Sequence, residues 1–232
     1  MTGLPAGMAI RELATVDDVV AAAAVLREVW RTDRDSVPTN LMIALAHTGN
    51  YVVGLYDDER LVGASVAFFA SPAARSMHSH ITGVLPEYQS MGLGRVLKQH
   101  QRAWALARDV GTITWTFDPL VARNARFNLS VLGARATAYV VDMYGRMNDG
   151  VNRGDETDRI LVSWAVASAP ARTPVQVAAT VAVPADIHEL RKSNPSDAAA
   201  HRVRVREELR THLDAGLIIA GFDTRGYLLV AS

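Results

Sequence analysis

Hydrophobic and polar residues follow two different periods along the chain, and the period of each stretch predicts its secondary structure. Residues 51–56 and 60–69 are rich in β-branched and aromatic residues, and the polar residues 57–59 between them predict a hairpin. A capping box at residues 15–18 precedes helical apolar spacing over residues 19–30. Further helices are predicted for residues 39–47 and 122–132, and strands for residues 8–14, 77–85, 112–117, 136–143 and 160–167.

One more helix follows the stretch YQSMGLGRVLK, residues 88–98, and should stop before Gly111. Its apolar face holds Leu93, Val96, Leu97, Trp104 and Ala107. The elements therefore run as strand, two helices, three strands, helix, strand, helix and two strands. Strands joined by both short hairpins and helical crossovers predict an α/β fold with a mixed central β-sheet flanked by helices.

A stretch of small residues and proline at residues 167–173 is the best candidate for a domain boundary. We expect a first domain at residues 1–168 and a C-terminal α/β extension at residues 169–232. In the extension we predict a strand at 175–183, helices at 185–192 and 196–213, and a hairpin at 217–230. Arg202, Arg206 and Arg210 form a stripe on the longer helix, and the neighbouring glutamates predict a solvated face rather than a nucleic-acid surface.

The bulk composition excludes several classes of protein. The chain has 24 basic and 24 acidic residues, so no overall field favours nucleic acid or a membrane surface. Cysteine is absent, which excludes thiolate catalysis and fits a reducing cytosol. No apolar run is long enough for a membrane span, and the N-terminus lacks the layout of a signal peptide. We therefore expect a cytoplasmic protein without nucleic-acid or membrane partners.

The glycine turn at residues 89–94 has the form of a phosphate-binding loop. A P-loop would require Gly-Lys-Ser/Thr, but Arg95 and Val96 follow Gly94. A dinucleotide fingerprint would require a small residue where Leu97 stands. The pattern Gln/Arg-x-x-Gly-x-Gly/Ala is met, and there the free amides at a helix N-terminus hold a pyrophosphate. A turn that only caps a buried helix is the alternative.

The order of the elements, the lead-in at residues 84–88 and the later Asn124…Phe127…Leu132-Gly133 segment resemble the GNAT (Gcn5-related N-acetyltransferase) family over residues 8–167. The resemblance extends to a bacterial branch of predicted acyltransferases. It implies the GNAT fold, with acetyl-CoA or another acyl-CoA as a substrate and no metal. The cofactor-binding residues that it implies are Thr82, Gly83, Val84, Gln89, Ser90, Met91, Gly92, Leu93, Gly94, Arg95, Asn124 and Phe127.

In the implied chemistry an amine attacks the thioester, so a base must keep the amine neutral. Regular strand alternation would put His78, His80, Thr82 and Val84 on one face. The His-x-His pair is similar to that of arylalkylamine N-acetyltransferases, which implies a proton-carrying role for His80 and His78. A hydrogen-bonded core pair and a zinc site are alternatives, although a third zinc ligand is not evident. Gly83 is interpreted either as a bulge that admits the pantetheine arm or as a strand glycine beside a packed neighbour.

Leu129 stands where many family members have a tyrosine that protonates the leaving thiolate. Tyr144 is our candidate for that acid, with Tyr139, Ser130 and water as alternatives. The polar stretch of residues 144–159 resembles the region that borders the acceptor site, and Arg159 could bind an acceptor carboxylate.

The resemblance implies an acyl-CoA-dependent N-acyltransferase that transfers acetyl, or a larger acyl such as succinyl, to the amine of a small molecule, for example an amino acid. The alternatives are a non-catalytic acyl-CoA-sensing module and a protein N-acetyltransferase. A homodimer is compatible with either activity.

Overall fold

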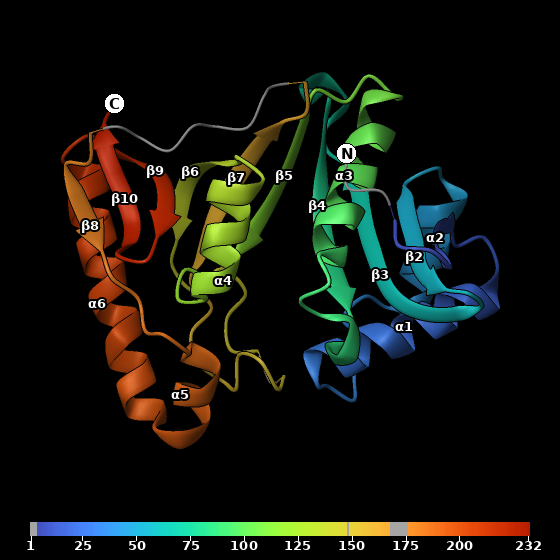
Figure 1. Ribbon diagram of the computed structural model, residues 1–232, viewed down its shortest axis with the longest axis horizontal. Coiled ribbons are helices and arrows are strands. Elements are labelled where there is room, and N and C mark those ends of the chain that lie inside the picture. Colours follow the sequence, from blue (N-terminus) through green and yellow to red (C-terminus); the bar gives the residue numbers. More distant parts are fainter. Residues whose placement is uncertain (1–3, 148, 168–175) are drawn as a thin grey trace. The chain divides into compact units, whose positions relative to one another are not determined.

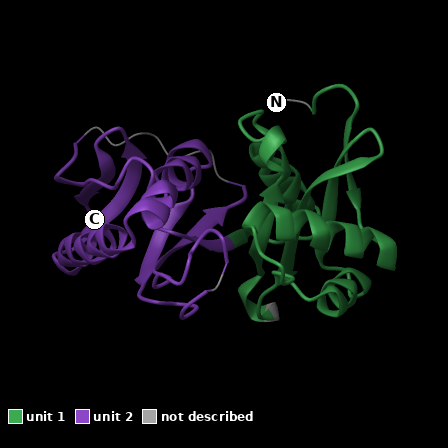
Figure 2. Cartoon of the chain, turned by 90° about the horizontal axis from the view of Figure 1, so that it is seen from below, with its two compact units in different colours: residues 1–113 green, residues 114–232 purple. Residues whose placement is uncertain are grey.

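A computed structural model of the chain describes residues 4–147, 149–167 and 176–232. The chain forms two compact units, residues 1–113 and residues 114–232 (Figure 2). Most of the predicted boundary at residues 167–173 lies outside the described residues. The division into domains 1–168 and 169–232 therefore stays a prediction.

Unit 1 contains an antiparallel run of four strands in the order β1-β2-β3-β4, of which β2, β3 and β4 are labelled in Figure 1. Their bounds are β1 Met8–Glu12, β2 Tyr51–Asp57, β3 Arg60–Phe69 and β4 Ser76–Val84. The predicted hairpin between β2 and β3 is confirmed, with Asp57 paired to Arg60. The turn uses Asp58 at a φ of 50°, a left-handed conformation that aspartate tolerates better than most residues.

Helix α1 (Val16–Trp30) begins at the predicted capping box. The Thr15 hydroxyl accepts a hydrogen bond from the Asp18 amide, and the Asp18 carboxylate accepts one from the Thr15 amide. The helix packs on β3 and β4. Because Ala22 and Ala23 are small, the helix approaches the sheet closely, and its buried side joins residues of β3 in one core.

Helix α3 (Leu93–Leu106) packs against β4 and β2, and helix α2 (Thr39–His47) against β2. On α3, Trp104 meets Tyr51 of β2 edge to face, with ring centroids 5.3 Å apart. The Tyr51 hydroxyl lies 2.9 Å from Nδ1 of His100. These contacts bury one side of α3, although the helix also carries several polar residues.

Unit 2 places three strands in the order β5-β7-β6. Strand β5 (Thr112–Phe117) starts at the last two residues of unit 1, and β6 (Arg135–Val140) pairs antiparallel with β7 (Arg159–Ala165). The predicted helix at residues 122–132 is confirmed in extent but changes type. It begins as α4 (Ala122–Ala125) and continues as a π-helical segment, Arg126–Val131, in which the Leu132 amide donates to the Phe127 carbonyl.

The C-terminal segment packs on the rest of unit 2. Its elements are β8 Ala179–Val181, α5 Ile187–Ser193, α6 Pro195–Asp214, β9 Leu217–Asp223 and β10 Gly226–Ala231, with a small sheet in the order β8-β10-β9. The buried Tyr227 hydroxyl donates to the Pro119 carbonyl at 2.7 Å. The Ser130 hydroxyl exchanges two hydrogen bonds with the backbone of Phe222. The described part of the extension is therefore integral to unit 2.

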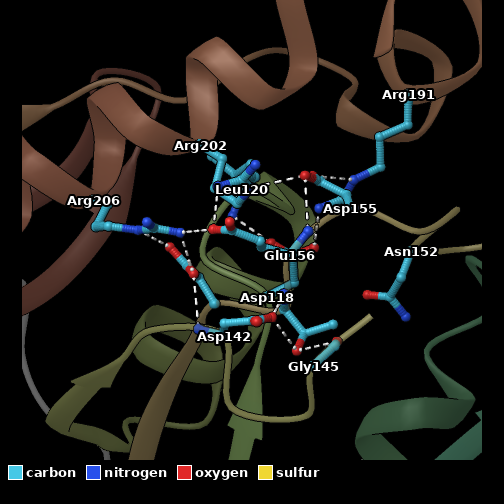
Figure 3. A network of polar contacts seen from close by, with 12 residues as sticks. Asp118, Leu120, Asp142, Gly145, Asn152, Asp155, Glu156, Arg191, Arg202 and Arg206 are labelled. Atoms are coloured by element: carbon cyan, nitrogen blue, oxygen red, sulfur yellow. Dashed lines mark hydrogen bonds and ion pairs between the residues drawn. The ribbon is translucent and has the colours of Figure 1, made fainter. Parts of the chain in front are cut away.

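The expectation of a solvated arginine stripe on α6 was wrong for two of its three members. Arg202 is buried and pairs with Asp155 and Glu156 (Figure 3). Arg206 pairs with Glu156 and Asp158. Only Arg210 is exposed. The prediction took the glutamates on the same helix as the partners of the arginines. The partners are instead the acidic residues at positions 155, 156 and 158.

Within the described residues, no helix has the length and apolar character needed to span a membrane.

Candidate functional site

The predicted phosphate loop is held against the end of β4 by side-chain contacts within unit 1. The Gln89 amide group donates to the Val84 carbonyl at 3.1 Å. The Tyr88 hydroxyl donates to the Asp57 carboxylate at 2.8 Å. A short 3₁₀ turn, Pro86–Tyr88, connects the two elements. These contacts hold the loop next to the end of β4 at Val84.

The loop presents backbone amides at the start of α3. Gly92 is the N-cap at a φ of 78°, a conformation that glycine adopts without strain, and Ser90 also has a positive φ of 69°. The first helical bonds are donated by Arg95 and Val96 to the Gly92 carbonyl. The amides of Leu93 and Gly94 precede these donors, so they are available to an anion at the positive end of the helix.

Gly94 has no packing reason to be glycine. Apart from its chain neighbours and the backbone of its own helix, a Cβ built at Gly94, or at Gly92, would meet no atom of the described residues within 4 Å. Ser90 and Met91 beside them are exposed. A loop that keeps its backbone bare toward open space fits a ligand that approaches it closely, and the residues present therefore fit a bound pyrophosphate.

Strand β4 carries a bulge at His80. Ile81 pairs with Val66 and Ser79 pairs with Ala67, so His80 is an extra residue without a partner on β3. Paired residues of antiparallel strands share a face, and faces alternate along β3. Ile81 is therefore on the Val66 face, whereas Thr82, which pairs with Ser65, is on the opposite face.

The predicted common face of the two histidines with Thr82 and Val84 was wrong, because the bulge resets the alternation. His78 pairs with Phe68, and the ring of His80 lies 5.9 Å from that of Phe68, so both histidines are on the face covered by α1. The Thr82 hydroxyl instead meets Ser65 at 2.7 Å on the face covered by α3. The implied cofactor contacts of residues 82–84 use the backbone and do not depend on this face.

Both histidine rings lie near the ring of Phe68, with centroids 5.4 Å (His78) and 5.9 Å (His80) from it. The His78 and His80 ring centroids are 6.3 Å apart. Burial lowers the pKa of His78, and the nearby His80 and Lys98 lower it further. The ring of His80 reaches solvent, but loss of part of its hydration still lowers its pKa. Both rings are therefore neutral near pH 7 and able to accept a proton.

Gly83 lies under helix α1. A Cβ there would come within 2.6 Å of the Trp30 ring and 3.0 Å of a Val29 methyl group. The pairing of Gly83 with Ala64 is regular, and the register shift between β3 and β4 falls at His80 instead. Within unit 1, Gly83 therefore acts as the strand glycine beside a packed neighbour. Its contact with a cofactor stays a prediction.

Sequence reasoning missed a buried lysine on the other face of β4. Lys98 of α3 is buried, and its ammonium donates to the Ser79 hydroxyl at 2.7 Å and to the Gln101 side chain at 3.2 Å. Burial lowers the pKa of Lys98 to about 7. The apolar spacing of the helix placed Leu97 and Trp104 inward, and Lys98 borders that face; its buried partner Ser79 gave no signal in the sequence.

The remaining candidate residues for cofactor, acid and acceptor contacts lie in unit 2. Asn124 and Phe127 are half-buried, in α4 and in the π-helical segment. Leu129 is buried. Ser130 is engaged with the backbone of β9, as described above. Beside them, the buried Asn128 accepts a hydrogen bond from the Trp115 indole at 3.0 Å, a contact that the sequence did not indicate.

Among the acid candidates the two tyrosines differ. The Tyr139 hydroxyl donates to Asp158 at 2.6 Å, and burial together with this carboxylate raises its pKa strongly. Tyr144 is 45% exposed, and its hydroxyl lies 3.1 Å from the Thr116 hydroxyl. Tyr144 is thus the tyrosine that an external molecule can reach.

Arg159 is buried next to Tyr144. Its guanidinium donates to the Asp158 carbonyl at 2.8 Å and to the Asn152 side chain at 3.0 Å, and lies 5.5 Å from the centre of the Tyr144 ring. Arg159 is thus not solvated, and no aspartate or glutamate carboxylate in the described ranges forms an ion pair with it. Its use by an acceptor stays a prediction.

No group of three or more histidine, aspartate or glutamate side chains in the described ranges could hold a metal ion.

Comparison with known proteins supplies the family. Residues 13–129, half of the chain, match the Acetyltransferase (GNAT) family. The chain belongs to the GNAT family. It is accordingly an acyltransferase, as the glycine loop and the order of its elements predicted. No curated protein matches the sequence.

Solved structures with the same fold cover about 70% of this GNAT chain. The ribosomal-protein-S18-alanine N-acetyltransferase from Escherichia coli matches with a TM-score of 0.57 and 16% identity, over 72% of this chain and 99% of its own. The putative acetyltransferase yncA from Salmonella typhimurium, solved with acetyl-CoA, matches with a TM-score of 0.55 and 20% identity, over 72% and 98%. The PaiA N-acetyltransferase from Thermoplasma acidophilum, solved with coenzyme A, matches with a TM-score of 0.53 and 14% identity, over 68% of this chain and 98% of its own. These likenesses confirm the predicted GNAT fold.

Proposed function

We propose that this GNAT protein is an acyl-CoA-dependent N-acyltransferase that transfers an acetyl group, or a larger acyl group such as succinyl, to the amine of a small molecule. The observation that carries the proposal is the glycine loop at the start of α3, with bare backbone at Gly92 and Gly94 and an anchor to the end of β4. Family membership supplies the reaction class.

Acyl-CoA would bring an activated thioester carbonyl to the site. The amides of residues 90–95 would hold its pyrophosphate, with added charge from Arg95, and the Gln89 side chain would keep the loop in place. The backbone of residues 82–84 would bind the pantetheine arm. Asn124 and Phe127 complete the proposed cofactor contacts.

The histidines on β4 would manage the proton of the amine. An α-amino group has a pKa near 8 and is largely protonated at neutral pH, so a base must remove its proton before attack. The lowered pKa values of His80 and His78 leave both rings neutral and competent for this step. His80, which reaches solvent, is our first candidate for contact with the amine, and His78 would pass the proton onward.

Tyr144 and Arg159 are the proposed acid and the proposed acceptor ligand. Tyr144 is exposed, unlike Tyr139, and can donate a proton to a leaving thiolate. Arg159 donates one hydrogen bond to the Asp158 carbonyl and one to the Asn152 side chain. A guanidinium has five N–H donors, so Arg159 retains donors for an acceptor carboxylate. This role favours an amino acid as the acceptor.

Two other functions have specific support. Leu129, at the position of the usual tyrosine, favours an acyl-CoA-sensing module without turnover. The Escherichia coli neighbour, described as acting on a ribosomal-protein alanine, favours a protein N-acetyltransferase. The absence of cysteine agrees with the cytoplasmic location that we propose, and a homodimer is compatible with each function.

A panel assay of thiol release tests the proposal. The full chain is incubated with acetyl-CoA or succinyl-CoA and with amino acids, their decarboxylated amines, or short peptides. Faster release with an amino acid than with its decarboxylated amine supports the proposed function and Arg159. Release with peptides only would establish the protein N-acetyltransferase, and tight CoA binding without release would establish the sensor.

A further inference from the structure

A pocket of about 260 Å³ lies within unit 2, between residues 146 and 152–156 on one side and the helices α5 and α6 on the other. None of the proposed cofactor, base, acid or acceptor residues lines it. Its wall contains four arginines against two carboxylates, so the cations are in excess by two. The charged residues of the wall are Arg146, Arg153, Arg191, Arg202, Asp155 and Glu156.

The two carboxylates are already taken by the buried arginines. Asp155 accepts from Arg191 at 3.2 Å and from Arg202 at 2.8 Å, and Glu156 accepts from Arg202 at 2.7 Å (Figure 3). Arg146 and Arg153 are exposed. Within the described ranges, no acidic side chain pairs with either of their guanidinium groups. The excess charge of the wall is therefore located on two side chains that an external anion can reach.

The wall also holds an unsatisfied donor. Arg191 is buried and its Nη2 pairs with the Asp118 carboxylate at 2.8 Å, but its Nη1 has no hydrogen-bond partner among the described residues. Buried guanidinium donors are normally satisfied, because an unpaired one costs free energy. The first residue of α6, Pro195, and Ala199 one turn later complete this side of the pocket. The positive end of a 20-residue helix thus adds to the field of the arginines.

We propose that this pocket is a binding site for a small molecule that carries two or more carboxylate or phosphate groups. Arg146 and Arg153 bind the anion directly through paired N–H donors, which match the oxygens of a carboxylate or a phosphate. Arg191 and Arg202, held in place by Asp118, Asp155 and Glu156, form a fixed and largely charge-compensated floor, and the unpaired Nη1 of Arg191 is a further donor. The volume is below the roughly 300–1,000 Å³ of sites for drug-sized ligands, which favours a compact polyanion over a nucleotide or a peptide.

Calorimetric titration of the full chain with citrate and with inorganic phosphate tests this site. Citrate should bind the wild type more tightly than inorganic phosphate, which carries a single anionic group, and Arg153→Ala and Arg146→Ala should each weaken citrate binding at least tenfold. Arg210→Ala is the matched control, because Arg210 is exposed on α6 outside the wall and should leave the affinity unchanged. Absence of binding to the wild type, or an equal loss in the Arg210 variant, would overturn the proposal.

A second arm separates this site from the glycine loop, which is also expected to bind phosphate groups. Citrate affinity should be the same with saturating CoA present, and the same in Gly94→Val. Displacement of citrate by CoA, together with loss of citrate binding in Gly94→Val, would locate the anion at the glycine loop and overturn the proposal. Neither arm requires turnover, so failure of the proposed acyltransferase function would be seen separately.

Discussion

Gly94 has no side chain, although the surrounding structure leaves space for one. Open space around the missing Cβ means that packing within the described residues does not require a glycine there, which fits a ligand that approaches the backbone. The same reasoning separates Gly94 from Gly83, where Trp30 of α1 fills the space. Glycines that look alike in the sequence therefore have different roles: one permits packing within unit 1, and the other leaves backbone amides accessible.

Substitution of Gly94 tests the phosphate loop. Gly94→Val should weaken CoA binding about 10–100-fold, because a branched side chain separates the pyrophosphate from charge-assisted hydrogen bonds that contribute about 1.5–3 kcal/mol. Calorimetry with CoA measures the change. Gly94→Ala is the control, since alanine satisfies the loop pattern and should keep most of the affinity. Unchanged CoA binding by a folded valine variant would remove the loop from the site.

The histidine pair is tested by turnover and its pH dependence. His80→Ala should lower kcat by about 10²-fold, the usual scale for loss of a general base, and His78→Ala should lower it less. Neither variant should lose CoA affinity. Since the pKa of each ring is lowered, wild-type activity should persist below pH 6.5 and decline as the pH falls through these values.

Raising the pH should partly restore both variants, because a larger share of the amine is then neutral without a base. His212→Ala, on α6, serves as a control that should keep full activity. Wild-type turnover by the double histidine variant at pH 7 would show that the pair is structural.

At the scale of elements, β4 is defined by what covers its two faces. The bulge at His80 turns the histidines toward the α1 side, while Ser79 and Thr82 face α3. On the α3 side, Lys98 is buried against Ser79 and Gln101. A buried ammonium group is costly in its charged form, which is the reason for its lowered pKa. The contact between α3 and β4 should therefore respond to pH.

Lys98 predicts a specific trend in the free energy of unfolding. Its pKa is about 7 when folded and near 10.4 when unfolded, so between these values the unfolded chain holds a proton that the folded chain lacks. Wild-type stability should rise with pH in this window, relative to Lys98→Met, by up to about 1.4 kcal/mol per pH unit. Urea unfolding at pH 7, 8 and 9 measures it. Lys192→Met at an exposed lysine should show no such trend, and parallel curves for wild type and Lys98→Met would refute the assignment.

At the scale of the whole molecule, the C-terminal segment is attached to the rest of unit 2 by buried charges. Arg206 of α6 pairs with Asp158, which also accepts from the Tyr139 hydroxyl and the Asp142 amide. Burial alone would raise the pKa of Asp158, but the hydrogen bonds from Arg206 and Tyr139 outweigh it and lower the pKa. Removing one partner of such a buried pair leaves an uncompensated charge.

Arg206→Leu should therefore destabilise the protein by about 3–5 kcal/mol, and Arg210→Leu by less than about 0.5 kcal/mol. Thermal or urea unfolding at pH 7 measures both. Because the folded pKa of Asp158 is lowered, the stabilisation is complete above its unfolded pKa near 3.9 and is lost as the pH falls through the folded value. The two variants should converge at that acidic limit. Equal stability of the two variants at pH 7 would show that the pair does not attach α6.

Much of the architecture follows from the sequence by itself, because local signals and the fold agree. The Thr15–Asp18 box starts α1, the aspartates at 57–58 close the β2–β3 hairpin, and Gly92 starts α3; each depends on chemistry within a few residues. The GNAT family was predicted for the same reason, since its glycine motif is contiguous in the sequence; phosphate binding by that loop stays a prediction.

Only the tertiary structure decided which faces and partners these residues have. A one-residue bulge at His80 reverses every following side chain of β4, and strand periodicity cannot reveal it. The partners of Arg202 and Arg206 lie about 50 positions earlier in the chain, so the charges on α6 alone gave a misleading impression of solvent exposure. Local chemistry determined where the elements begin and end, whereas packing between distant segments determined which charges are buried and which remain available to a ligand.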